Sequence, residues 1–260
     1  MAGLLAGPHS DRGETVIFLV LPAYNEEKSL PPLLAEIASI LGETGHAYRV
    51  VVVDDGSTDG TAGVVRAAAS SMPISLVSHP ANRGLSEALK TGLLEAQKEI
   101  SPRDVIVTMD SDNTHIPGLI LRMVRMIREG YDVVIASRYR RESRVIGVPL
   151  SRRILSRGAS LLFRILFPTR GVRDFTSGYR AYRASLIQEM FSAYGDDFVN
   201  RPGFSCMVDI LLKIRRRPLV AGEVPLILRY DRKASDSKMK VGKTVFETLG
   251  LIATRLFERR

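Results

Sequence analysis

Two aspartates separated by a single residue, Asp110 and Asp112, are the side chains of this sequence best suited to chemistry. They follow an apolar run over 105–109 and precede a helix that Pro117 begins. This order predicts a buried strand ending in two carboxylates, and ligands of open α/β sheets bind beyond such strand ends. Hard divalent cations bind carboxylates together with substrate phosphates, so the pair indicates a metal-diphosphate site. An Asp-rich turn that caps the helix is the alternative.

Three further acids follow two other apolar runs. Glu26 comes after the run over 16–21, and Asp54 and Asp55 follow the run over 49–53. In a parallel sheet these strand ends share one edge, so we expect the acids to converge on one crevice. Clustered carboxylates are unfavourable unless a cation or hydrogen-bond donors neutralise them, which favours the metal interpretation.

Alternating strands and helices must position these acids. Helices are expected after Ser29, which would cap the first of them, and then from Thr61, from Asn82 and from Pro117. This alternation predicts an α/β fold with a doubly wound, mostly parallel sheet and C-terminal amphipathic helices. The expected strands cover 16–21, 49–53, 74–78, 105–109 and 131–136.

The pattern changes after residue 138. An amphipathic helix is expected over 151–167, a polar loop over 174–183, a helix over 204–214, a strand over 223–230 and a closing amphipathic helix over 245–257. No linker divides the chain. We therefore expect one domain over 16–240, a disordered lead-in over 1–15 and a C-terminal amphipathic segment over 241–260.

The net charge of +9 is concentrated in one segment. Residues 138–173 contain ten arginines and one acid, and the remainder has 27 basic and 27 acidic residues. Such a concentration attracts polyanions or an anionic membrane. The helix over 151–167 is therefore a candidate for the membrane surface, and a core-packed helix with solvated arginines is the alternative.

Composition and motifs exclude several classes of protein. The single cysteine, Cys206, excludes internal disulfides and a cysteine-rich zinc site. No G-x-G-x-x-G follows an expected strand, and the P-loop-like Gly242-Lys243-Thr244 has Ser237 where the first glycine belongs. The arginines are not interleaved with stacking aromatics, so no nucleic-acid partner is expected. No uncharged apolar run reaches the roughly 18 residues of a membrane-spanning helix.

Seven segments together resemble the ordered motifs of one enzyme family, the inverting family 2 glycosyltransferases with a GT-A fold. The later segments are similar to the dolichol-phosphate mannose synthase branch, whose acceptors are polyprenyl phosphates. The segments are VLPAYNEE (20–27), VVVDDGSTDGT (51–61), NRGLSEALKTGL (82–93), MDSDN (109–113), ASRY (136–139), DFTSGYRAYR (174–183) and EVPLILRYDRKASDSKM (223–239).

The resemblance implies roles for the matching residues. Asp110 and Asp112 would ligate the metal, Mg²⁺ or Mn²⁺, and Asp112 and Arg138 would be catalytic. The acceptor phosphate would contact Arg138, Arg152 and Ser156, the last two one helical turn apart and able to face one anion. The nucleotide-sugar donor would contact Pro22, Ala23, Tyr24, Glu26, Val53, Asp55, Asp110, Ser111, Asp112, Arg232 and Lys238.

The implied reaction is metal-dependent, inverting transfer of a hexose, with mannose from GDP-mannose as the expected donor sugar, to a polyprenyl (dolichyl) phosphate. Residues 138–183 would bind the acceptor. The protein would be peripheral at the cytoplasmic side of a membrane, held by its amphipathic helices or by a membrane-anchoring subunit. Two alternatives stay open. One is a soluble transferase that uses Asp174, Asp209 or Glu223 as a base toward a hydroxyl acceptor, and the other is a non-catalytic module that binds a nucleotide-sugar or a membrane.

Three positions depart from the family pattern. Thr114 stands where relatives often have a Gln that is a third metal ligand. Met207 and Asp209 stand where the branch commonly has Gln and Glu. With less help from the protein, the metal is expected to bind much better when the donor is present.

Overall fold

A seven-stranded sheet with the order β3-β2-β1-β4-β7-β5-β8 forms the centre of the molecule. The computed structural model describes residues 15–233, 250–252, 254 and 255. Neighbouring strands are parallel except β7, which is antiparallel to both β4 and β5. The expected α/β fold with a mostly parallel sheet is confirmed. The strands are β1 (Ile17–Ala23), β2 (Tyr48–Asp54), β3 (Ile74–Ser78), β4 (Val105–Thr108), β5 (Val133–Ser137), β7 (Arg180–Arg183) and β8 (Ala221–Pro225).

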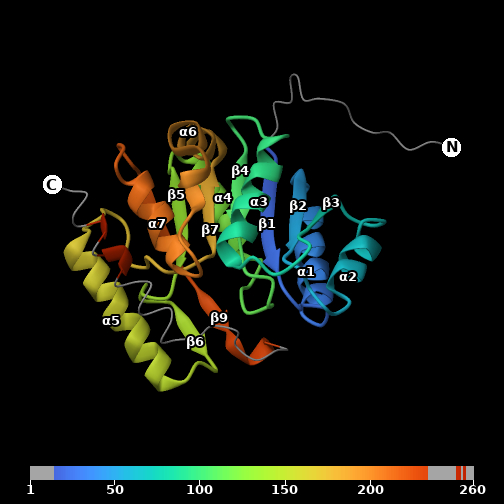
Figure 1. Ribbon diagram of the computed structural model, residues 1–260, viewed down its shortest axis with the longest axis horizontal. Helices are drawn as coiled ribbons and strands as arrows, with labels where there is room; N and C mark the ends of the chain where they lie inside the picture. The colour runs from blue at the N-terminus through green and yellow to red at the C-terminus, as the bar shows by residue number, and fades with distance from the viewer. Residues whose placement is uncertain (1–14, 234–249, 253, 256–260) are drawn as a thin grey trace.

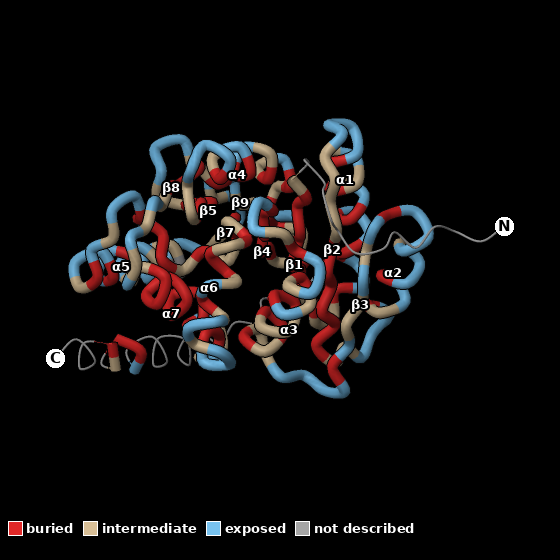
Figure 2. Tube along the Cα trace, turned by 90° about the horizontal axis from the view of Figure 1, so that it is seen from above, coloured by how far each residue is buried: buried red, intermediate tan, exposed pale blue. Residues whose placement is uncertain are grey.

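Helices cover both faces of this sheet. On β1, Ile17 and Leu19 belong to one buried cluster, shared with α1, α2 and α4, whereas Phe18 and Val20 belong to another, shared with α3, α6 and α7. This division arises because successive strand side chains point to opposite faces. Figure 2 shows the buried strands between the two helical layers. The helices are α1 (Leu30–Glu43), α2 (Thr61–Ala68), α3 (Leu85–Gln97), α4 (Leu119–Arg128), α5 (Leu150–Leu166), α6 (Ala184–Tyr194) and α7 (Ser205–Ile214), with short 3₁₀ helices η1 (Gly195–Val199) and η2 (Tyr230–Arg232).

The segment 174–183, expected to be a loop, ends in the central strand β7. The sequence did not predict this strand, because β7 begins with Arg180 and an arginine normally indicates an exposed position. Here its fully buried guanidinium donates to the backbone carbonyls of Phe175, Ser177 and Met207 at 2.7 to 2.8 Å. These three carbonyls replace the water that the charge would otherwise require.

The strand expected over 223–230 is divided in two. After β8, the chain leaves the main sheet and forms β9 (Ile227–Arg229), which pairs in parallel with β6 (Arg144–Ile146). Leu226 N–H still donates to the carbonyl of Ser137 at 2.9 Å, and the Leu226 carbonyl accepts from Arg144 N–H at 3.0 Å, which leads the chain from β8 to β6. This division brings η2 and Lys233 back toward β4, since Arg229 N–H donates to the carbonyl of Thr114 at 2.9 Å.

Ser29 precedes α1 as expected, but its side chain makes no capping hydrogen bond. A capping oxygen normally accepts from the second or third N–H of the helix. Those positions are Pro31 and Pro32, which have no N–H. The expected serine cap is therefore wrong, and the prolines explain why.

The described residues of the C-terminal segment, 250–252, 254 and 255, are all helical, and Leu251 and Ile252 are buried in the core. The remainder of the expected closing helix and residues 1–14 lie outside the described residues. None of the helices in the described part of the chain has the length and hydrophobicity needed to cross a bilayer. Helix α5 and the β6–β9 ribbon lie beyond the sheet edge at which β1 and β4 end (Figure 1).

Candidate active site

The acidic pair Asp110 and Asp112 lies in the turn after β4, and two contacts hold this turn. The buried Ser111 hydroxyl donates to the carbonyl of Pro22 at 2.8 Å, which ties the turn to the end of β1. Asn113 turns the chain with a positive φ of 61°. Pro22, Asp110 and Met207 also line one small pocket, so Asp110 lies near Pro22, an expected donor contact.

Asp112 has partners on both carboxylate oxygens. Its Oδ1 accepts from the hydroxyl and the backbone N–H of Thr114, at 2.7 and 3.2 Å. Its Oδ2 accepts from Lys233 Nζ at 2.5 Å. Burial alone would raise the pKa of Asp112, but the charge of Lys233, then that of His115, outweighs it and lowers this pKa.

The negative charge of Asp110 is less well compensated than that of Asp112. Burial raises its pKa, the nearby Asp112 charge adds to this rise, and His115 opposes it only in part. His115 Nε2 lies 3.9 Å from Asp110 Oδ2, too far for a hydrogen bond. The pair therefore attracts additional positive charge.

The pair fits a hard divalent cation, because carboxylate oxygens are its preferred protein ligands and, among the described residues, Asp110 has only a 3.9 Å ion pair with His115. In the residues that the structure describes, no group of three or more His, Cys, Asp or Glu side chains is arranged to hold a metal ion. Further ligands would therefore come from substrate phosphates and water, the usual situation for Mg²⁺. Asp110 and Asp112 are the residues that would hold it.

Of the acids after β2, Asp54 is used within its own loop and Asp55 by the segment that follows β3. Asp54 Oδ1 accepts from Ser57 N–H at 3.0 Å. Asp55 accepts from the N–H groups of Arg83 and Gly84, at 2.9 and 2.7 Å, and contacts His79 Nδ1 at 2.7 Å. Hydrogen-bond donors therefore already compensate Asp54 and Asp55, and these two acids need no cation.

The other expected donor residues lie along the same edge. Pro22 pairs with Val53 in the register of β1 and β2, so these two expected donor contacts are neighbours. Glu26 is buried and its charge contributes to a raised pKa of Lys233, although burial opposes this and Asp112 contributes more. Arg232 is exposed in η2, with Nη1 3.5 Å from Glu36. Lys238 lies outside the described residues. Ala23 ends β1, and Tyr24 begins the loop that follows.

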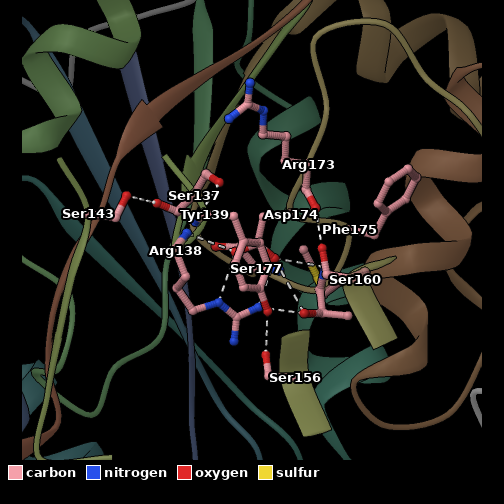
Figure 3. Close-up of polar contacts among 12 residues, drawn as sticks. Ser137, Arg138, Tyr139, Ser143, Ser156, Ser160, Arg173, Asp174, Phe175 and Ser177 are labelled. Carbon is pink, nitrogen blue, oxygen red and sulfur yellow. Dashed lines mark hydrogen bonds and ion pairs between the residues drawn. The ribbon is translucent and has the colours of Figure 1, made fainter. Parts of the chain in front are cut away.

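Arg138, the first expected acceptor residue, is held firmly at the end of β5. Its Nε and Nη2 donate to Asp174 at 2.9 and 2.7 Å, and Nη2 also donates to Thr176 at 2.5 Å (Figure 3). Burial would lower the Arg138 pKa, but Asp174 raises it. Burial would likewise raise the Asp174 pKa, and Arg138 lowers it. Both groups are therefore charged.

Tyr139 connects Arg138 to helix α5. The Arg138 guanidinium lies 5.6 Å from the Tyr139 ring centre, and the Tyr139 hydroxyl is 2.6 Å from Ser156 Oγ (Figure 3). Two expected acceptor residues, Arg138 and Ser156, are thus connected by Tyr139. Arg152 belongs to the same helix, but its side chain lies outside the described part of the structure.

Arg138 also lies within electrostatic reach of the acidic pair. The Asp110 charge contributes to raising the Arg138 pKa, although burial opposes this rise and Asp174 contributes more. Arg138 in turn helps to lower the pKa of Asp110, against the larger effect of burial. The expected acceptor residue Arg138 and the expected metal ligand Asp110 therefore interact electrostatically.

The three carboxylates named as bases for a hydroxyl acceptor are all engaged. Asp174 holds Arg138. Asp209 is paired with Lys213 at 2.6 Å and Arg255 at 2.5 Å. Glu223 Oε1 accepts from the N–H groups of residues 173 and 174 at 2.6 and 2.7 Å, and burial raises the Glu223 pKa.

Sequence reasoning missed Lys233 and the partnership of Arg138 with Asp174. The signal for Asp174 was present in its motif, DFTSGYRAYR, which lies 36 residues after Arg138. Lys233 lies within the last motif but beside the arginine to which the resemblance assigns a role. Neither contact follows from spacing alone.

Helix α5 carries an apolar strip that faces solvent. Leu150, Ile154, Leu161 and Ile165 are 67%, 61%, 55% and 67% exposed, and their spacing places them on one side of the helix. Arg157 and Arg164 are exposed beside this strip. The opposite side packs on the core through Phe163 and Phe167. The expected core-packed helix and the expected amphipathic surface helix are thus both present, on different faces.

The sequence matches the model of the family described as glycosyl transferase family 2 over residues 18–191. This chain belongs to that family. The expected family resemblance is therefore confirmed. Because the match covers β1 through most of α6, it includes both the acidic pair and Arg138.

Similar family 2 proteins include polyprenyl-phosphate mannosyltransferases by name. A dolichol-phosphate mannosyltransferase from Pyrococcus furiosus is 33% identical over 90% of this chain, which spans 61% of that protein's length. An undecaprenyl-phosphate mannosyltransferase from Micrococcus luteus is 32% identical over 87% of this chain and 88% of its own length.

Among solved structures, glucosyl-3-phosphoglycerate synthase from Mycobacterium tuberculosis, in complex with Mn²⁺, UDP and phosphoglyceric acid, has a similar fold. The TM-score is 0.65 at 24% identity, covering 94% of this chain and 78% of that one. At this identity, the likeness concerns the fold.

Proposed function

We propose that this protein is a metal-dependent, inverting transferase that moves a hexose from a nucleotide-sugar to a polyprenyl phosphate. The observation that carries the proposal is that the Arg138 guanidinium and the Asp110 carboxylate are near enough for each charge to shift the pKa of the other. One site then accommodates an acceptor phosphate and a donor diphosphate. The names of the 32–33% identical relatives support the same acceptor class.

An acceptor phosphate needs an anion-binding site more than a base. It is already an anionic nucleophile, so in-line positioning and leaving-group stabilisation carry the rate. Arg138 and Ser156, with Arg152 from the same helix, would hold this phosphate, and Arg donates to phosphate in a bidentate manner. Because Asp174, Asp209 and Glu223 are engaged elsewhere, a hydroxyl acceptor is less well served.

The donor would lie across the ends of β1 and β2. Pro22, Ala23, Tyr24 and Glu26 would contact the nucleotide, with Val53 and Asp55 near its base and ribose. Arg232 and Lys238 would stabilise the negative charge that grows on the leaving nucleoside diphosphate. GDP-mannose is the donor that we propose.

Asp110, Ser111 and Asp112 would form the metal-diphosphate motif. A bound Mg²⁺ or Mn²⁺ supplies Lewis-acid stabilisation of the diphosphate leaving group. Asp112 keeps the charge that attracts this cation, because Lys233 and His115 lower its pKa against the effect of burial, and Ser111 fixes the turn of both aspartates against β1. Asp112 and Arg138 are thus the residues on which transfer depends most.

We further propose that the protein works as a peripheral protein at the cytoplasmic surface of a membrane. The exposed apolar strip of α5, with Arg157 and Arg164 beside it, suits insertion among lipid headgroups. Ser156 of this helix lies at the acceptor site, so a docked α5 would bring that site to the lipid. A membrane-anchoring subunit would reinforce the attachment.

The test is transfer of radiolabelled mannose from GDP-mannose to a polyprenyl phosphate in detergent, with Mg²⁺ or Mn²⁺. We expect labelled lipid with the native protein and less than about 1% of that with Asp112→Asn, the scale of loss expected when transition-state stabilisation is removed. UDP-glucose and a water-soluble glycan are run as the alternative donor and acceptor. Absence of labelled lipid with every metal and donor would refute the proposal.

A further inference from the structure

The family resemblance gives no role to Lys233, yet its ammonium group is bound at the metal pair. Lys233 Nζ lies 2.5 Å from Asp112 Oδ2, and both side chains are only 13% exposed. The other oxygen of Asp112 is used by Thr114, whose hydroxyl donates at 2.7 Å. Asp112 is therefore fully engaged by the protein itself.

Backbone contacts fix the position of Lys233. The β9 strand joins the turn that carries Asp112, because Leu228 forms an antiparallel bridge with His115 and Arg229 N–H donates to the carbonyl of Thr114. Lys233 N–H then donates to the carbonyl of Tyr230 at 3.3 Å, which turns the chain toward the site. The contact with Asp112 therefore results from the fold of this segment.

A divalent cation and an ammonium group compete for the same oxygen of Asp112. Two positive charges a few ångströms apart repel strongly in a partly buried site. Thr114 intensifies the competition, since its hydroxyl donates to Oδ1 of Asp112 and so occupies the second carboxylate oxygen. The metal must therefore either move Lys233 or bind weakly.

We propose that Lys233 is the resident counter-cation of Asp112, which the metal displaces when the donor arrives. This inference rests on the proposed function, because it concerns the same metal-diphosphate site. The donor diphosphate offers new oxygens both to the metal and to the displaced ammonium group. Lys233 thereby makes metal binding depend on bound nucleotide, and it becomes a donor-site cation beside Arg232.

The experiment measures Mn²⁺ binding to the purified full chain by electron paramagnetic resonance, without nucleotide and with GDP or UDP. Lys233→Met should raise the affinity for Mn²⁺ alone by at least about fivefold, a typical coupling between two sites. Because Lys233 is already displaced when nucleotide is bound, the substitution should not raise the Mn²⁺ affinity further in the presence of GDP. The gain in Mn²⁺ affinity caused by GDP should therefore shrink by the same factor. Lys233→Arg should stay close to the native protein, because it keeps the positive charge.

Two variants serve as controls. Lys98→Met removes an exposed lysine directly after α3, where it pairs with Glu95, and should leave Mn²⁺ binding unchanged. Asp112→Asn should abolish the effect of Lys233→Met, because the two residues act on one oxygen. Lys233→Gln replaces the methionine variant if circular dichroism shows that the latter is unfolded.

Equal Mn²⁺ affinity in Lys233→Met and the native protein would overturn the inference while leaving metal-dependent transfer intact. An effect of Lys233→Met that persists with Asp112→Asn would also overturn it. If no variant binds Mn²⁺ with or without nucleotide, and transfer needs no metal, the proposed metal site fails and the inference fails with it.

Discussion

Arg138 illustrates how a buried ion pair can prepare a cation for a ligand. Asp174 accepts hydrogen bonds from Nε and Nη2 of the Arg138 guanidinium, so the orientation of Arg138 is set before any phosphate binds. Asp174 is itself fixed, because it also accepts from the N–H of Ser177 at 3.1 Å. A guanidinium positioned in this way loses little conformational entropy on binding an anion.

Asp174→Asn should therefore impair acceptor binding more than donor binding. It keeps the shape but removes the charge that orients Arg138, so we expect the KM for polyprenyl phosphate to rise at least about tenfold, or 1.4 kcal/mol. We also expect a loss of unfolding free energy of about 3 kcal/mol, since a largely buried charge is left unpaired. Steady-state kinetics with each substrate and urea unfolding measure the two effects.

Thr176→Val is the matched control, because it removes a neighbouring contact of Arg138 without removing a charge. It should change the KM for the acceptor less than Asp174→Asn does. Equal increases in the KM values of donor and acceptor with Asp174→Asn would contradict a role specific to the acceptor site.

Helix α5 combines two functions because its faces differ. Phe163 anchors it to the core with no exposure, while Ile154 and Ile165 face solvent. Exposed strips of this kind on a soluble surface usually mark an interaction site. The arginines beside the strip favour an anionic partner such as a phospholipid surface.

Replacing Ile154 and Ile165 with Glu should release the protein from vesicles that contain anionic phospholipid. The change removes apolar area from the docking face and adds negative charge, so the vesicle partition coefficient should fall at least about tenfold. Leu94→Glu is the matched control, because Leu94 is 40% exposed on α3, outside this strip. Co-sedimentation measures binding, and unchanged partition of the double variant would contradict membrane docking by α5.

At the scale of the whole molecule, the buried carboxylates divide into two groups with opposite effects on stability. The pKa of Asp174 is lowered, so its ion pair stabilises the fold above the ordinary aspartate pKa and is lost as the pH falls through the lowered value. Burial raises the pKa of Glu223, so its ionisation costs stability as the pH rises through the raised value.

The unfolding free energy should consequently pass through a maximum at mildly acidic pH. Glu223→Gln keeps an oxygen that can accept from the same N–H groups, so it should flatten the decline toward neutral pH. Asp174→Asn should flatten the decline below about pH 4, the ordinary range of aspartate. Urea unfolding at a series of pH values in the absence of metal tests both expectations. If the unfolding free energy of Asp174→Asn declined below about pH 4 as it does in the native protein, groups other than Asp174 would cause that decline.

The sequence by itself determined the order of strands and helices up to β5, because their hydrophobic periods are local properties. It also identified Asp110 and Asp112, since a strand that ends in two acids is readable from neighbouring residues. It failed at β7, where Arg180 is buried by carbonyls distant in the chain, and at Ser29, where two prolines remove the donors.

Only the tertiary structure decided which acids remain for a cation. Asp54 accepts from its own loop and Asp55 from the segment after β3, whereas Asp112 is held by Lys233, 121 residues later. Among the described residues, Asp110 has only the 3.9 Å ion pair with His115. Hydrogen bonds and ion pairs across such separations depend on how β9 returns to β4, which no local pattern records. The sequence determined the chemical groups, and the packing determined which of them are free to react, because neutralisation of a charge depends on what surrounds it in space.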